Sequence, residues 1–391
     1  MACLNKNSSK NIFYNIQSPS LKYLLRFYGY FSIQLFPFNF CHFPSLAHAF
    51  WNLFLASFAF YRVSEFQKAS QSDIDPVFAA VVATKPLFGI VVTIGLNFLY
   101  LTTTVLNTFY FVFINYNSSK LIRLLDIGFC QVVPFNSVCQ SRRFIFKLVA
   151  VYLVVFLISN ISLFYGTVRR GGLAFCLRQT TISFLLNINN HAVFVLTHYY
   201  KYGTLVSLDQ MISTLCYHSK QQLPNYLSEF EKNFVSLARL NQQLNSLLSF
   251  PLLLMTVPYI TEVLITASFA YIAAFNGFNL YLFQFVVHMV LFAMHEAQIT
   301  EKLCLITKVL NEQFDKQQKK VFSHFKTSSM SSLDLLFKNK KLFFGKVNLV
   351  NVYKSNFQLR IFHLMPINWA TIFAVVFFVT NYAVLISQTS T

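Results

Sequence analysis

The sequence predicts an all-α protein that crosses a membrane seven times. Hydrophobic residues make up 55% of its 391 residues, and charged residues make up only 11%. A typical soluble domain has about 25% charged residues, so this chain lacks the polar side chains needed to cover a soluble surface. The apolar residues form blocks close to the ~20 residues that a helix needs to cross a bilayer core. The charges fall between these blocks, as in a polytopic membrane protein.

Seven apolar blocks are long enough to be predicted membrane spans. The stretch 21–40 is also apolar, but it carries Lys22 and Arg26 and ends near Pro37. We therefore expect an interfacial helix there rather than an eighth span. The predicted spans cover 45–62, 86–112, 144–165, 173–199, 248–274, 278–298 and 365–388.

The distribution of basic residues predicts the orientation of the chain. The net charge is +18, and 25 of the 31 Lys and Arg residues lie in the N-terminal segment, in the loops on its side of the membrane or, for Lys147, at the rim of such a loop. The other side holds five. The positive-inside rule then places the N-terminus in the cytoplasm and the C-terminus outside, opposite to a G-protein-coupled receptor. The N-terminal segment lacks the apolar core of a signal peptide, so we expect no cleavage there.

Two cytoplasmic segments, 200–247 and 299–364, are predicted to be helical because their apolar residues recur at a spacing of three to four. Helices continuing out of the spans would pack these apolar stripes against each other below the membrane. The alternative is a set of loose amphipathic segments lying on the lipid. The stripes are Phe230, Phe234, Leu237, Leu240, Leu244 and Leu247, then Ile299, Leu303, Ile306 and Leu310.

Polar side chains inside the predicted spans are candidates for binding or gating. Glu262 lies in the fifth span, and an ionisable group at that depth normally faces a cavity or a partner. A role in a ligand pocket and a structural pairing with His288 both stay open. The fourth span carries a polar stripe that either joins helices or lines a wet pocket. The stripe comprises Thr180, Thr181, Asn187, Asn190 and His191.

No motif in the chain predicts an enzyme, a cofactor site or a metal site. The sequence contains no nucleotide-binding loop and no G-x-S-x-G, and its seven Cys include no C-x-x-C pair. His288 and His295 are not part of an H-E-x-x-H motif, so we expect no metal. The basic run 337–346 is expected to meet anionic lipid headgroups rather than nucleic acid.

The last span ends in "NYAVLISQT", in which Tyr382 and Gln388 lie six residues apart. Together with seven spans and a cytoplasmic N-terminus, this stretch resembles the signature of the arthropod-type gustatory receptors, which share a superfamily with insect odorant receptors. That signature is Thr-Tyr, five mostly apolar residues, then Gln-Phe. In this chain Asn381 replaces the Thr, Ser387 replaces an apolar residue and Thr389 replaces the Phe.

The resemblance implies a ligand-gated, nonselective cation channel built from four identical or related subunits. It would lie in the plasma membrane of sensory cells, open in response to a small-molecule tastant, and contact membrane lipids. The family's cytoplasmic helices form an anchor domain with most of the subunit contacts, and its last span is broken. Pro366 fits such a break as a hinge, because proline cannot donate to the helix ladder.

The resemblance also implies a pore at the end of the last span. At 100° per residue, Asn381, Val384, Leu385 and Gln388 share one helix face. Four copies around an axis would give a ring of Gln388 amides above an apolar ring, which can gate by dewetting. In the alternative reading, Gln388 lies at the outer headgroup level.

The family's ligand cavity lies in the outer half of spans two to six, where aromatic faces and amides suit small, partly polar ligands. We therefore expect four units: a cytoplasmic N-terminal segment (1–44), a ligand-binding bundle of six spans (45–298), anchor helices (299–364) and a pore-lining helix (365–391). Candidate ligand-binding residues are Asn160, Tyr165, Thr181, Phe184, Glu262, Tyr271, Tyr281, Gln284 and His288.

Two other functional classes remain as alternatives. A secondary transporter would be expected to show inverted repeats and discontinuous spans at the membrane midplane. The chain has one candidate break, at Pro366, and no internal repeat. An odorant-receptor-like or G-protein-coupled receptor for small organic ligands is the second alternative, and the charge asymmetry disfavours the G-protein-coupled class.

Overall fold

The computed structural model describes the chain mainly in its C-terminal half. It describes 193–217, 223–269, 279–325, 343–361 and 365–389, with short pieces at 50, 57, 120–121, 123–126, 143, 146–147, 149–151 and 154. The predicted interfacial helix and the second predicted span lie outside these residues, as do most of the first and third spans. The division of the chain into four units therefore stays a prediction.

Two long helices form the main axis of the described part of the chain. They are α7 (Leu223–Phe269) and α8 (Asn279–Phe325), each with 47 residues. At 1.5 Å per residue each is ~70 Å long, more than twice the thickness of a bilayer core. Each helix runs without interruption between a predicted span and part of its predicted cytoplasmic segment: α7 covers 223–247 of the segment 200–247, and α8 covers 299–325 of the segment 299–364. The expected continuity of the helix across the predicted span boundary is thus confirmed for these two, while the spans themselves stay predictions.

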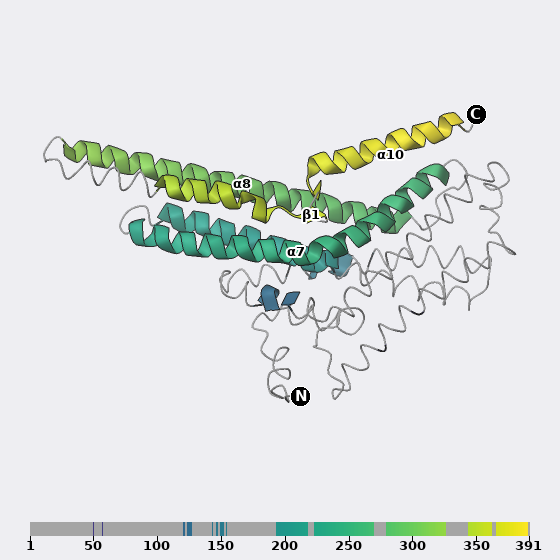
Figure 1. The fold of residues 1–391 in the computed structure, drawn as a ribbon, viewed down its shortest axis with the longest axis horizontal. Helices are drawn as coiled ribbons and strands as arrows, with labels where there is room; N and C mark the ends of the chain where they lie inside the picture. The colour runs from purple at the N-terminus through teal and green to yellow at the C-terminus, as the bar shows by residue number, and fades with distance from the viewer. Residues whose placement is uncertain are drawn as a thin grey trace, which may run out of the picture.

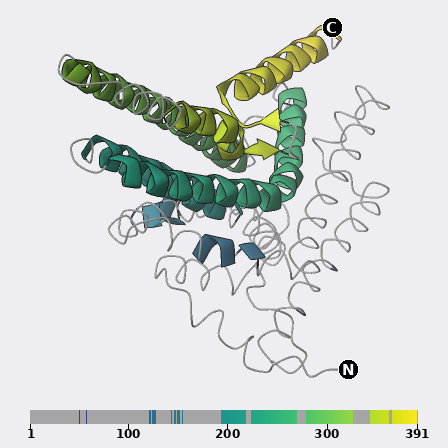
Figure 2. The same ribbon diagram turned by 60° about the vertical axis from the view of Figure 1, so that its left-hand side comes forward.

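The helix α7 is bent, as Figures 1 and 2 show. It carries Pro251 and Pro258, and each of these removes one hydrogen bond from the helix ladder. Across the ranges that the structure describes, no helix combines the length and the apolar character that crossing a membrane requires. The seven-span topology therefore stays a prediction from the sequence.

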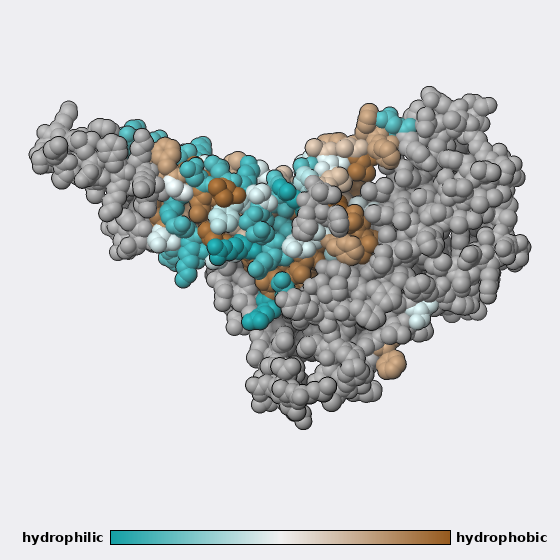
Figure 3. Space-filling model, in the orientation of Figure 1, coloured by the Kyte–Doolittle hydropathy of each residue, from teal (hydrophilic) through white to brown (hydrophobic). Residues whose placement is uncertain are grey.

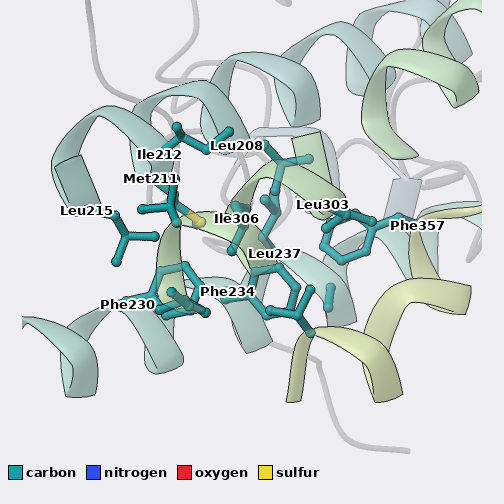
Figure 4. Packing of buried hydrophobic residues seen from close by; sticks show 14 of the residues in the cluster. Leu208, Met211, Ile212, Leu215, Phe230, Phe234, Leu237, Leu303, Ile306 and Phe357 are labelled. Carbon is teal, nitrogen blue, oxygen red and sulfur yellow. The ribbon is translucent and has the colours of Figure 1, made fainter. Parts of the chain in front are cut away.

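A hydrophobic core joins α7 and α8 to two further helices, 193–217 and 343–353 (Figure 4). Leu208, Ile212 and Leu215 come from the first of these, and Val350 comes from the second. Burying each large apolar side chain contributes about 1.5–3 kcal/mol, so this core holds the four elements as one bundle.

The two apolar stripes meet in this core, as predicted. Phe234, Leu237, Ile306 and other stripe residues are buried in one cluster, which excludes the reading of loose, unpacked segments. Leu247 is the exception among the ten, since it is only partly buried. Leu240 and Leu244 are buried outside this core. The stripe residues within it are Phe230, Phe234, Leu237, Ile299, Leu303, Ile306 and Leu310.

A short hairpin connects the bundle to the last helix. The 343–353 helix ends in a 3₁₀ turn, η2 (Lys354–Phe357), which is followed by β1 (Arg360–Ile361) and β2 (Met365–Pro366). The two strands are antiparallel, with Ile361 opposite Met365.

The last helix, α10 (Trp369–Thr389), begins four residues later than the predicted span. Pro366 is part of β2, and Asn368 caps the helix: its Oδ1 accepts the Thr371 N–H at 2.9 Å. Asparagine favours this position because its side chain satisfies a backbone donor that lacks a helical partner. The predicted break near Pro366 is therefore a hairpin and a new helix start in this structure.

The helix α10 contacts α7 and α8, and it extends away from the arm formed by the bundle (Figure 1). Several of its large apolar side chains are exposed, including Phe373 (66%), Phe377 (69%) and Phe378 (59%). Apolar surface gathers near this helix, whereas the arm formed by the bundle is largely hydrophilic (Figure 3). Such a helix needs lipid or another subunit to cover it.

Candidate functional site

A buried ion pair lies where the bundle meets the chain leading to α10. Lys201, on the 193–217 helix, is fully buried, and its Nζ lies 2.5 Å from Oε1 of Glu296 on α8. The same Nζ donates to the Phe357 carbonyl at 2.5 Å. Glu296 Oε1 in turn accepts the Leu359 backbone N–H at 3.1 Å. We call these two side chains, with the backbone groups of Phe357 and Leu359, the clamp.

Burial shapes the electrostatics of the clamp. Removal from water lowers the pKa of Lys201 below its usual value, and the adjacent Glu296 carboxylate opposes this shift. Burial also raises the pKa of Tyr200 well above its usual value, and the charge of Glu296 acts in the same direction. A buried charge destabilises the folded protein unless it is paired and hydrogen-bonded. Lys201 and Glu296 are paired with each other, and each also has a hydrogen bond to the backbone.

A second set of contacts from α7 holds the same segment. Asn245 Nδ2 donates to the carbonyls of Asn356 (3.0 Å) and Gln358 (2.9 Å). Its Oδ1 accepts the Tyr200 hydroxyl at 2.5 Å. Residues 356–359 are thus held by side chains from three helices, so this junction fixes how the backbone enters the hairpin before α10.

A stack of imidazole and phenyl rings lies next to the clamp. Nε2 of His198 and Nδ1 of His288 are 3.0 Å apart, and the rings of His198 and Phe292 stack at 4.1 Å between centroids. His288 also stacks on Phe194 at 4.6 Å. The predicted ligand-binding residue His288 is therefore buried between helices and bonded to a second histidine. In the described part of the chain, no group of three or more His, Cys, Asp or Glu side chains is placed to hold a metal.

The predicted pore residues all belong to α10. The backbone of this helix is described through Thr389, so Val384 and Leu385 each lie about one helical turn from Gln388. Asn381 is exposed. The side chains of Tyr382, Val384, Leu385 and Gln388 lie outside the described residues, so the proposed ring stays a prediction.

Most predicted ligand-binding residues lie outside the described part of the chain. Glu262 is on α7, while Tyr281 and Gln284 are on α8, but the directions of these three side chains are not described. The cavity, and the alternative pairing of Glu262 with His288, are therefore untested. The residues wholly outside the described ranges are Asn160, Tyr165, Thr181, Phe184 and Tyr271.

The sequence reasoning missed the residues of the junction. Asn241 and Asn245 are spaced four apart within the leucine stripe of α7, and both are buried. Polar residues at core positions of an amphipathic helix need partners, and that signal could have marked them. The sequence marks Lys201 and Glu296 less clearly. Each is a charged residue within three residues of a predicted span end, where charged residues are common.

Comparison with known proteins identifies the fold. No protein-family model matches this chain, and no curated protein matches it in sequence. Its structure is similar to that of the insect olfactory receptor OR5 from Machilis hrabei, with a TM-score of 0.66 and 10% sequence identity over 94% of this chain and 97% of the receptor. The chain has the fold of an insect olfactory receptor. The same receptor in complex with eugenol matches with a TM-score of 0.64 and 10% identity, over 96% of this chain and 99% of that chain.

The fold agrees with the resemblance that the sequence motif indicated, and at 10% identity the fold is what this likeness shows. It extends over nearly the whole chain, whereas the sequence motif covered only the last span.

Proposed function

We propose that this chain is a chemoreceptor subunit that forms a ligand-gated, nonselective cation channel. The observation that carries the proposal is the likeness to an insect olfactory receptor over 94–96% of the chain. One of those structures holds eugenol, a small aromatic compound. We accordingly propose a small organic molecule as the ligand, and a receptor rather than an enzyme.

The shape of α10 supports a pore made by several copies of the chain. This helix leaves the bundle and exposes an apolar surface, so a second subunit or lipid must cover it. A helix that lines a pore needs a polar or small residue on the water-filled side, and Gln388 near its end supplies an amide. We propose four identical or related subunits in the plasma membrane, with the N-terminus in the cytoplasm.

The finer proposal is a gustatory role, and it rests on the sequence "NYAVLISQT". A tastant would bind in the bundle, displace α7 and α8, and move α10 so that the ring of Leu385 and Gln388 widens. Opening is then a change in equilibrium between two arrangements of α10, which the ligand biases by binding one of them more tightly.

Whole-cell recording of cells that express the chain tests the proposal. A panel of tastants and odorants, with eugenol included, should evoke a cation current whose reversal potential is the same in Na⁺ and K⁺ solutions. A transporter would instead give a current tied to one substrate gradient, and the absence of any evoked current from surface-expressed chain would refute the channel.

Gln388→Ala should alter ion selectivity or single-channel conductance, because it removes an amide dipole from the proposed ring. Ser387→Ala is the matched control: it removes a polar group one residue away, on a different helix face. Equal conductance and selectivity in wild type, Gln388→Ala and Ser387→Ala would contradict the pore assignment while leaving an evoked current intact.

A further inference from the structure

We propose that the Lys201–Glu296 ion pair positions the start of α10, and so links the movement of the 193–217 helix and α8 to the last helix. The gating role of this link rests on the proposed function; the positioning role does not. Lys201 and Glu296 are therefore positioning residues, acting on α10 through the backbone of the hairpin.

The first argument concerns the hydrogen-bond partners of the two charged side chains. Lys201 Nζ donates to the Phe357 carbonyl, and Glu296 Oε1 accepts from the Leu359 N–H. The pair thus holds two backbone groups only two residues apart, on either side of Gln358. Buried ion pairs are seldom more stabilising than apolar residues of the same volume, and their best-attested use is to specify one arrangement. Here the arrangement specified is that of the 357–359 backbone.

The second argument is that Leu359 is held from both sides. Its N–H bonds to Glu296 on α8, and its carbonyl accepts the Ile367 N–H at 2.9 Å. Ile367 is two residues before Trp369, the first residue of α10. A displacement of Glu296 is therefore passed through two hydrogen bonds across the hairpin to the start of the last helix.

The third argument is where the clamp side chains come from. Lys201 follows the end of the predicted span 173–199 by two residues, and Glu296 lies near the end of the predicted span 278–298. Both spans belong to the proposed ligand-binding bundle. Since a close, desolvated pair resists separation, a ligand that shifts one of these helices must either carry the hairpin with it or break the clamp.

The chain offers a matched control for the clamp. Lys302 and Asp209 form a 2.6 Å ion pair between the same two helices, but their side chains are 30% and 53% exposed. That pair contributes little in water. A variant without the Lys302–Asp209 pair loses an ion pair between these two helices but keeps the partners of Phe357 and Leu359. It therefore separates the effect of losing an ion pair from the effect of losing the clamp.

The experiment is hydrogen exchange of the full-length protein in detergent, read at the amides of Leu359, Thr371 and Ile372. Lys201→Met with Glu296→Leu replaces both charges by apolar side chains of similar volume, so the bundle should still fold. It leaves the Leu359 N–H without its acceptor. We expect exchange at Leu359, and at the first turn of α10, to rise by about 5- to 100-fold, with the thermal midpoint of the whole protein little changed.

Two further variants make the result specific. Lys201→Met with Glu296→Gln returns an acceptor to the Leu359 N–H and should restore most of its protection. Asp209→Asn with Lys302→Met should exchange like the wild type. Wild-type exchange in the apolar variant, equal acceleration in the control variant, or no recovery with Gln at 296 would each overturn the positioning role.

The gating role is tested by measuring the cation current without ligand, divided by the number of receptors at the cell surface. The apolar clamp variant should differ from the wild type by about five-fold or more, since α10 loses a restraint worth at least one hydrogen bond, while the control variant should not. Equal basal currents in all three would overturn the gating role. A wild-type chain that carries no current refutes the proposed channel instead, and the exchange rates then decide whether the clamp positions α10.

Discussion

At the scale of single residues, the junction before α10 is built from a few buried polar side chains that each have more than one hydrogen-bond partner. Asn245 uses its amide for two backbone carbonyls and for the Tyr200 hydroxyl. Lys201 is buried yet bonds to both a carboxylate and a carbonyl. Removing one partner leaves the other buried without a hydrogen bond, and this lowers the free energy of unfolding by more than the bond itself contributed. The loss of a single partner should therefore be measurable.

Removing one charge of the clamp should cost more than removing both. Lys201→Met leaves Glu296 buried beside an apolar side chain, and uncompensated buried charges cost about 3–5 kcal/mol. The double variant Lys201→Met with Glu296→Leu leaves no charge behind and should lose much less. Chemical denaturation in detergent, followed by tryptophan fluorescence, compares the two variants with the wild type. A single variant as stable as the double would show that Glu296 finds water or another partner.

At the scale of elements, the sequence predicted the packing of the long helices but not the path into α10. Phe230, Leu237 and Ile306 follow the helical period, and periodicity alone places them on one buried face. The hairpin at 360–366 has only two residues per strand, too short for any periodic signal. The clamp joins residues 201, 296 and 357–359, and a single sequence does not indicate which of these distant residues pair, even where it marks one of them as unusual.

The start of α10 should depend on the cap at Asn368. Its Oδ1 accepts the Thr371 N–H at 2.9 Å and lies 3.0 Å from the Thr371 hydroxyl oxygen. Asn368→Ala removes this acceptor and should destabilise the first turn by about 0.5–2 kcal/mol. Asn368→Asp keeps the acceptor and adds a negative charge that the helix N-terminus favours, so it should preserve the turn.

Hydrogen exchange at the Thr371 amide measures the cap directly. The amide should exchange faster in Asn368→Ala than in the wild type, and at the wild-type rate in Asn368→Asp. Equal rates in all three proteins would mean that the hairpin, through the Thr371 hydroxyl bond to the Pro366 carbonyl at 2.6 Å, fixes the helix start without the cap.

At the scale of the whole molecule, the sequence predicts a class of protein and the structure shows a fold. Composition and charge asymmetry predict a helical membrane protein, and the structure has the fold of an insect olfactory receptor at 10% identity. At that identity most side chains differ, so what the two share is the fold. Fold does not determine which ligand binds, because that depends on the side chains of the site.

The orientation of the whole chain is the last property that the sequence predicts and that the fold alone leaves open. With 25 of 31 Lys and Arg on one side, a single misplaced span boundary does not reverse the asymmetry. Translocating these residues would oppose the positive-inside preference, so the N-terminus should stay in the cytoplasm. An epitope tag after Thr391 should then bind antibody on intact cells, and a tag before Met1 only after permeabilisation.

A second pair of tags checks whether the predicted number of spans is correct. Tags inserted in the predicted cytoplasmic segment 326–342 and the predicted outer loop 166–172 should behave like the N-terminal and C-terminal tags respectively. If both termini label on intact cells, the chain has an even number of spans, as it would if 21–40 crossed the membrane. If only the N-terminal tag labels, the orientation is that of a G-protein-coupled receptor, and the predicted cytoplasmic bundle of α7 and α8 would lie outside the cell.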